Sequence, residues 1–238
     1  MTEPKRKSRK ILKILAFGSV VIIAILTVAH CAWKYSGSGK WRLVKEKDGV
    51  QIYALKVPGA TLEQFKAVYR IKTTLNSIVA TMTDHSTEAC RKFVGPGCIA
   101  GPVLKEMDSQ DLTFIQSYRI VFNGPLRFLA PRDFVGKGQF SQDPQSKVLT
   151  ADFLTLSGLV PVDPCCVRVT NMHNTWRFTP LGDGQVQVEW AANYDPGIPY
   201  WAFNALQPIA IPQLRRRTQR VFNLEKYRHQ QFAWLKEG

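Results

Sequence analysis

The chain has 238 residues, of which 45% are hydrophobic, which suits one domain of about 200 residues with a sizeable core or two small domains. Its formal net charge is +14, and two terminal segments, 1–13 and 213–238, carry +5 each. Charge gathered at the two ends, without aromatic residues interleaved on a docking face, argues against nucleic acid as a partner. It fits an anionic membrane surface or, for the second segment, a solvated helix face.

The first predicted element is an apolar helix over residues 11–33. Residues 14–29 contain no charged side chain, and about 20 apolar residues at 1.5 Å each span a hydrocarbon core of about 30 Å. Basic residues precede the helix, and Trp33 and Tyr35 stand where an interfacial aromatic belt belongs. We therefore predict a basic cytoplasmic stub at 1–10, a single transmembrane helix, and an extracytoplasmic soluble domain that is periplasmic if the protein is bacterial. The alternative is a signal peptide whose cleavage releases a secreted domain.

Five cysteines show no paired spacing of the kind that binds zinc, so we expect no metal and no other cofactor. Cys90 and Cys98 could form a disulfide in an oxidising compartment, although spacing alone does not decide this. The adjacent Cys165 and Cys166 are expected to be buried packing residues, because neighbouring cysteines bridge only with strain.

A linker at 34–40 precedes a predicted soluble domain at 41–238, in which period-two hydrophobic runs dominate. Residues 74–93 are predicted to be helical, as one helix or as two that meet near Asp84. The segment after Pro212 contains no further proline and suits a long terminal helix. Many antiparallel strands and one long terminal helix predict an α+β fold. The predicted strands are 50–57, 65–72, 103–107, 113–122, 133–140, 148–156, 167–179 and 185–194.

Five short motifs follow one another along residues 41–232, nearly the whole predicted soluble domain. This order resembles the START domain, the steroidogenic-acute-regulatory-protein-related lipid transfer family. The resemblance implies a helix-grip fold, in which a curved antiparallel β-sheet wraps around a long C-terminal helix and leaves a tunnel for one lipid or sterol. The motifs are Asp48-Gly49-Val50-x-Ile52-Tyr53; Gly124-Pro125-Leu126; Pro131-Arg132-Asp133-Phe134-Val135; Val167-Arg168 with Trp176, Pro180 and Gly182; and Asp195-Pro196-Gly197-Ile198-Pro199-x-Trp201-x-x-Asn204.

The predicted site residues fall into three groups. Arg132 and Asp133 are predicted to form a structural ion pair at the start of a strand, not a catalytic pair. Leu159 and Val160 lie in an apolar loop that is predicted to contact a membrane, with packing on its own core as the alternative. Candidate ligand-binding residues offer an aromatic body for a lipid or a polar group for its headgroup; they are Tyr118, His173, Trp190, Asn193, Trp201 and Asn204.

Moving a lipid chain of about 16 carbons into water costs on the order of 13 kcal/mol, at about 0.8 kcal/mol per CH₂. We therefore predict a non-enzymatic protein that binds a single lipid or sterol in an internal hydrophobic cavity and carries or presents it at a membrane. Catalytic residues are not assigned, because the chain contains neither GxSxG nor HExxH. One alternative is a helix-grip enzyme acting on a hydrophobic substrate, for which His173 and Asp152 would be tested. The other is a lipid sensor or tether; protein partners are unknown.

Overall fold

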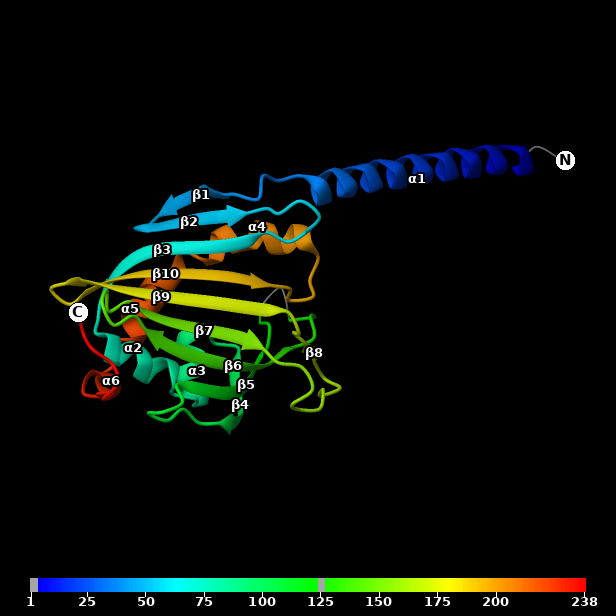
Figure 1. Ribbon diagram of the computed structural model, residues 1–238. Helices are drawn as coiled ribbons and strands as arrows, with labels where there is room; N and C mark the ends of the chain where they lie inside the picture. Colours follow the sequence, from blue (N-terminus) through cyan, green and yellow to red (C-terminus); the bar gives the residue numbers. More distant parts are fainter. Residues whose placement is uncertain (1–3, 124–126) are drawn as a thin grey trace. The chain divides into compact units, whose positions relative to one another are not determined.

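The computed structural model describes residues 4–123 and 127–238, so the expected Gly124-Pro125-Leu126 motif lies outside the described residues. The chain divides into two compact units. The first consists of residues 1–40 and 55–61 and contains helix α1 (Pro4–Tyr35). The second consists of residues 41–54 and 62–238 and contains the sheet and the remaining helices (Figure 1).

Helix α1 contains a segment, Lys10–Tyr35, that is long and apolar enough to cross a membrane or to act as a signal sequence. Its end is fixed within the first unit by bonds to the loop at 55–61. The indole Nε1 of Trp33 donates to the carbonyl of Thr61 at 2.8 Å, and the Gly59 amide donates to the carbonyl of Lys34 at 2.8 Å. The carbonyl groups that are left unpaired at a helix end are partly satisfied in this way.

Within the described residues, ten strands form one sheet in the order β1-β2-β3-β10-β9-β7-β6-β5-β4, with β8 paired to β6. The pairs from β3–β10 through to β5–β4 are antiparallel, and β6–β8 is parallel. The strands are β1 (Trp41–Lys47), β2 (Val50–Leu55), β3 (Gln64–Lys72), β4 (Cys98–Lys105), β5 (Thr113–Ile120), β6 (Arg132–Gln142), β7 (Leu149–Thr155), β8 (Val167–Arg168), β9 (Met172–Gly182) and β10 (Gln185–Tyr194).

The helical stretch expected at 74–93 is two helices that meet near Asp84, α2 (Leu75–Met82) and α3 (Thr87–Phe93). Each begins at a hydroxyl cap: the side chain of Thr74 accepts from the Ser77 amide, and that of Ser86 accepts from the Ala89 amide. Such caps satisfy amides that have no partner inside the helix, which explains why each helix starts where it does.

The C-terminal helical segment is divided into α4 (Tyr200–Ala210), α5 (Gln213–Val221) and the short α6 (Glu225–Arg228). Pro212 precedes α5, as expected for the start of a helix, but the helix is shorter than predicted and α4 comes before it. Proline has no amide hydrogen and clashes with the preceding turn, which favours a break between α4 and α5 at Pro212, although α4 accommodates Pro208 within its last turn. The predicted fold class is confirmed: an α+β fold with a curved antiparallel sheet, C-terminal helices and one N-terminal apolar helix.

The core of the second unit lies between the sheet and its helices. Phe65, Ala67, Tyr69 and Ile71 alternate along β3 and are all buried, as the period-two pattern predicts. They join a cluster that includes Phe222, which follows α5 and is completely buried. Burying a large apolar side chain contributes about 1.5–3 kcal/mol, so this face fixes α5 against the sheet. The same inner face continues across β10, β9 and β7 toward β4 (Figure 1).

Candidate functional site

A cavity of about 360 Å³ lies inside the second unit, between the sheet and its helices. Strands β4 to β7, β9 and β10 form one side, and helices α2 to α5 contribute the other. Its volume is at the low end of the range of about 300–1,000 Å³ that is typical of small-molecule pockets. The space therefore suits one small or slender ligand.

Aromatic rings form much of the cavity wall. Tyr118 and Phe134 are stacked, with ring centroids 4.7 Å apart and an angle of 9° between the rings. The ring of Phe153 lies 6.0 Å from that of Tyr118, and Trp176 lies 6.1 Å from Trp190. These distances are within the range of favourable ring contacts. The wall is thus largely apolar.

Two glycines on β6 allow these rings to lie across the sheet. A Cβ atom at Gly138 would stand 2.0 Å from Cζ of Phe114, and one at Gly136 would stand 2.4 Å from Cζ of Phe153. Gly138 is the register partner of both phenylalanines, which come from the strands on either side of β6. A side chain at either glycine would push a ring into the cavity, so the glycines help to set the cavity's shape.

Several polar groups interrupt the apolar wall. The Nδ1 atom of His85 is hydrogen-bonded with Oε1 of Gln116, and both residues line the cavity. Among the described residues, Nε2 of His85 and Oδ1 of Asn174 are buried and have no hydrogen-bond partner. Glu106 approaches His85 Nε2 only to 3.8 Å. Because unpaired buried polar atoms are costly, a polar group on a ligand could bind here.

Two tyrosines add hydroxyl groups to the cavity wall. Burial raises the pKa of Tyr118, and the neighbouring Tyr194 raises it further. Burial also raises the pKa of Tyr194 to about 12, although a hydrogen bond from Gln207 Nε2, at 2.9 Å, works in the opposite direction. Both hydroxyls are therefore neutral at physiological pH and can donate a hydrogen bond.

Two of the six predicted ligand-binding residues, Tyr118 and Trp190, line the cavity. Asn193 is exposed, and Trp201 is 67% exposed on α4. Asn204, also on α4, accepts a hydrogen bond from the Glu63 amide through Oδ1, at 3.0 Å, and does not line the cavity. The structure thus brings together only part of the predicted set.

The structure directs His173 away from the cavity, contrary to our expectation. Its neighbours on β9, Met172 and Asn174, line the cavity, and successive side chains of a strand point to opposite faces. The exposed ring of His173 places Nε2 3.2 Å from Oδ1 of Asp152, which also accepts from Thr175 Oγ1 at 2.6 Å. The period-two pattern of β9 shows two faces but does not tell which one is concave.

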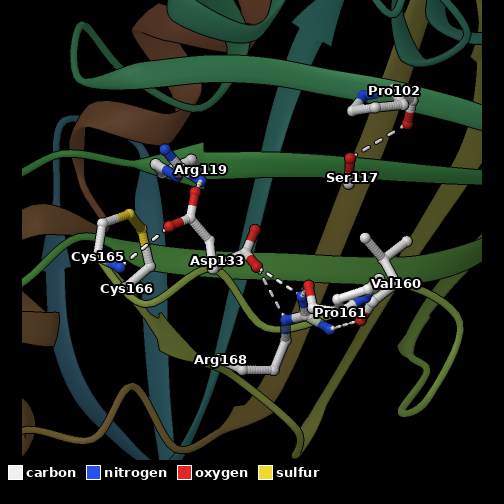
Figure 2. A network of polar contacts seen from close by, with 10 residues as sticks. Pro102, Ser117, Arg119, Asp133, Val160, Pro161, Cys165, Cys166 and Arg168 are labelled. Carbon is white, nitrogen blue, oxygen red and sulfur yellow. Dashed lines mark hydrogen bonds and ion pairs between the residues drawn. A yellow bond between two sulfur atoms is a disulfide. The ribbon is translucent and has the colours of Figure 1, made fainter.

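The predicted ion pair between Arg132 and Asp133 is not the pair that forms. Asp133 instead binds Arg168, whose Nη2 and Nε atoms lie 2.7 and 2.9 Å from Asp133 Oδ2 (Figure 2). Arg132 donates to backbone carbonyls, among them that of Gly197 at 3.0 Å. Adjacent residues of a strand point to opposite faces, so Arg132 and Asp133 diverge. The structural role stands, with a different partner.

The loop that contains Leu159 and Val160 is attached to this ion pair. Arg168 donates from Nη1 to the carbonyl of Val160 at 3.2 Å and from Nη2 to that of Pro161 at 3.0 Å (Figure 2). Leu159 is exposed. Contact of Leu159 and Val160 with a membrane stays a prediction.

Both pairs of cysteines are bridged, Cys90 with Cys98 and Cys165 with Cys166. The expectation that Cys165 and Cys166 are buried packing residues is wrong, because Cys165 is exposed and Cys166 is partly exposed; Figure 2 shows the bond between their sulfur atoms. Asp163 shapes their turn by accepting from the Cys165 amide at 3.0 Å. Its carboxylate and the two sulfurs lie within 4.8 Å of one another, but the bridge leaves no thiolate for a metal.

Sequence reasoning missed several residues that line the cavity. Phe114, Gln116 and Ile120 share a strand face with Tyr118, so the period-two rule could have found them from that one residue. His85 lies between two helices, where no periodic signal marks it. The polar anchor formed by His85 and Gln116 joins segments 31 residues apart and required the tertiary structure.

Among sequences, similarity to known proteins is modest. No family model matches the chain. The uncharacterized protein PA1579 of Pseudomonas aeruginosa is 24% identical over 173 residues, which cover 69% of this chain and 78% of that protein.

Among solved structures, the similarity is clear at the level of the fold. A STAR-related lipid transfer protein from Xanthomonas axonopodis covers 78% of this chain and 97% of its own, with a TM-score of 0.62 and 22% identity. Human STARD10 gives a TM-score of 0.65 at 14% identity, covering 80% of this chain and 76% of its own. Human StAR-related lipid transfer protein 5 gives 0.58 at 13% identity, covering 87% and 95%. The chain therefore has the START fold, as its motifs led us to expect.

Proposed function

We propose that the second unit binds a single lipid or sterol in its cavity and carries or presents it at a membrane. The observation that carries this proposal is a largely apolar space, lined by many aromatic rings, in a chain with the START fold. The structural neighbours that are named as lipid transfer proteins support the same assignment. The polar anchor at His85 and Gln116 suits a ligand with one polar end.

Lipid exchange requires that the cavity opens, and α4 and α5 are the proposed gate. They contribute Gln207, Ala210 and Leu214 to the cavity wall. Pro212 interrupts the helix between them, so α4 can move without unwinding α5. Shielding the ligand until the gate meets a bilayer removes most of the cost of exposing its chain to water.

The proposed arrangement of the whole chain follows the boundaries expected from sequence. Residues 1–10 are a cytoplasmic stub, 11–33 cross the membrane, 34–40 are a linker and 41–238 are an extracytoplasmic lipid-binding domain. The basic residues before the apolar segment support this orientation. Measuring the intact mass of the protein from its native membrane tests the anchor, because cleavage as a signal peptide would remove the first unit's helix.

We propose that the protein carries its lipid and does not catalyse a reaction on it. Asp152, His173 and Thr175 are hydrogen-bonded to one another, a grouping that could take part in acid–base chemistry. Asp152 is among the residues that line the cavity, but the ring of His173 and the hydroxyl of Thr175 belong to the face of β9 opposite the cavity-lining Asn174. We expect His173→Ala to leave the bound lipid chemically unchanged. Turnover of that lipid that stops in this variant would favour an enzyme.

The test uses the full chain reconstituted in vesicles with a photoactivatable lipid, followed by mass spectrometric mapping of the crosslinked peptides. Mapping separates lipid in the cavity from lipid around α1. Crosslinks are expected on β5 and β10, and exchange of lipid between vesicles should be faster than without protein. Ala151, which is buried and lines the cavity, is replaced by Trp to fill the space. The matched control is Ala191→Trp, because Ala191 lies on the face of β10 opposite to the cavity-lining Trp190.

We expect the Ala151→Trp variant to lose the cavity crosslinks and the exchange activity, and the Ala191→Trp variant to keep both. A wild-type protein that is crosslinked only along α1 and does not accelerate exchange would refute the proposed function.

A further inference from the structure

A second hollow, with a volume of about 760 Å³, lies between the β1–β2 turn, α3 and α5. Seven of the residues that line it are basic and one is acidic. We call this hollow the basic groove. Its exposed members include Lys47, Arg91, Arg216 and Arg220.

Most of the positive charge in the basic groove is not neutralised. Arg216 pairs with Asp48 at 3.1 Å, at an exposed site where such a pair contributes little. Within residues 4–123 and 127–238, Lys47, Arg91 and Arg220 form no ion pair. Cations gathered within about one Debye length, about 10 Å at 0.1 M salt, reinforce one another's field. The groove is therefore a strong attractor for negatively charged groups.

An exposed apolar face on α4 adjoins the basic groove. Trp201, Leu206 and Ile209 are 67%, 42% and 63% exposed, and their positions lie on one side of the helix. Ile209 is also part of the groove lining, and Lys45 ties β1 to this helix by donating to the carbonyl of Pro208 at 3.0 Å. Apolar residues beside clustered cations are typical of a surface that contacts a bilayer. A soluble polyanion would bind through the basic side chains alone and would not require the exposed apolar residues of α4.

The basic groove and the cavity share a wall. Arg217 on α5 lines both, and its Nη1 atom donates to the carbonyl of Val94 at the end of α3. Leu214, next to it on α5, faces the cavity. Anionic groups bound in the groove would therefore lie directly outside the wall that encloses the ligand.

We propose that the basic groove and the apolar face of α4 together dock on a bilayer that contains anionic phospholipids. The phosphates bind Lys47, Arg91, Arg216 and Arg220, and the side chains of α4 enter the headgroup region. The inference rests on the proposed function for the membrane as partner and deepens it, because it names the surface that docks and the charge of the lipid, whichever molecule the cavity holds.

In the test, the full chain is inserted through α1 into nanodiscs of phosphatidylcholine. Helix α1 is then not available to insert into the vesicles that are added. Vesicles of phosphatidylcholine, with or without phosphatidylglycerol, are added, and capture of nanodiscs by vesicles is measured by flotation. We expect capture only by the vesicles with phosphatidylglycerol. It should weaken as the salt concentration rises, since the Debye length falls from about 10 Å at 0.1 M to about 3 Å at 1 M.

Replacing Arg91, Arg216 and Arg220 by Gln removes three exposed charges from the groove. Each is expected to contribute about fivefold to affinity, so the triple variant should bind on the order of a hundredfold more weakly. The variant Ile209→Ser tests the apolar face and should also reduce capture. The matched control replaces three exposed basic residues elsewhere on the sheet by Gln: Arg70, Lys72 and Arg177.

Three results would overturn the inference: equal capture by neutral vesicles, an unchanged triple variant, or an equal loss in the control. Binding of tripolyphosphate without capture of phosphatidylglycerol vesicles would also overturn it and assign the groove to a soluble anion. Flotation does not report on the cavity, whereas the crosslinking described above does. A failure of docking is therefore distinguishable from a failure of lipid binding.

Discussion

The ion pair between Asp133 and Arg168 is expected to make a large contribution to the stability of the second unit. The side chains of Arg168 and Asp133 are only 7% and 11% exposed, and two guanidinium nitrogens lie within 2.9 Å of one carboxylate oxygen. Removing one partner of such a buried pair leaves an uncompensated charge and costs about 3–5 kcal/mol. We therefore expect Asp133→Leu to destabilise the protein by that amount. For a domain of about 200 residues this corresponds to a fall in Tm of roughly 6–20 °C.

The double variant Asp133→Leu/Arg168→Met distinguishes this explanation from simple loss of a contact. Replacing both charges with apolar groups of similar size is often close to neutral, so the double variant should recover most of the lost stability. The measurement is thermal and chemical unfolding of the full chain in nanodiscs, followed by tryptophan fluorescence. Arg119→Met is the control, because its pair with Asp163 is partly exposed and should contribute at most about 1 kcal/mol. A loss below about 1 kcal/mol in Asp133→Leu, or additive losses in the double variant, would refute the reasoning.

Three further predictions concern the cavity, the helices and the disulfide. Gly138→Ala should cost about 1–3 kcal/mol and reduce lipid crosslinking, because its Cβ would displace an aromatic ring into the cavity. Burial would raise the pKa of Asp84, but its hydrogen bonds outweigh this and hold the pKa below its usual 3.8. Asp84→Asn should therefore lower the stability by about 1–2 kcal/mol at neutral pH, and the difference should shrink as the pH falls below about 4. Replacing Cys90 and Cys98 by Ala should cost roughly 2–3 kcal/mol, because their bridge closes a loop of eight residues.

Gly158→Ala is the control for lipid crosslinking by Gly138→Ala, since nothing lies within 4 Å of a Cβ there. Its positive φ adds a backbone cost of about 1–2 kcal/mol, so the two variants are compared by crosslinking and not by stability. Equal crosslinking in both variants would contradict the prediction for the ring. For Asp84, a stability difference that stays constant down to pH 2 would show that the carboxylate's charge is not what matters. For the disulfide, unfolding under reducing conditions should abolish the difference between variant and wild type.

The alternation of apolar residues along the sequence predicts most of the strands. In β3 and β10 every second residue is buried, so the strands and their two faces could be assigned from sequence. The same alternation could not say which face is concave. That is why Tyr118 and Trp190 line the cavity while His173, one position out of phase on its strand, does not. A period of two defines faces, and only the curvature of the packed sheet decides which face encloses the ligand.

Local chemistry determined the apolar helix at the amino terminus, the strand pattern and the position of Pro212 at the start of a helix, because each depends on residues that are neighbours in the chain. Contacts between distant segments depended on the tertiary structure. Asp133 pairs with Arg168, which is 35 residues away in the chain, and not with the adjacent Arg132. The basic groove is likewise lined by residues of β1, α3 and α5. Burial and charge act through space, so partners such as these are decided only when the sheet closes around its helices.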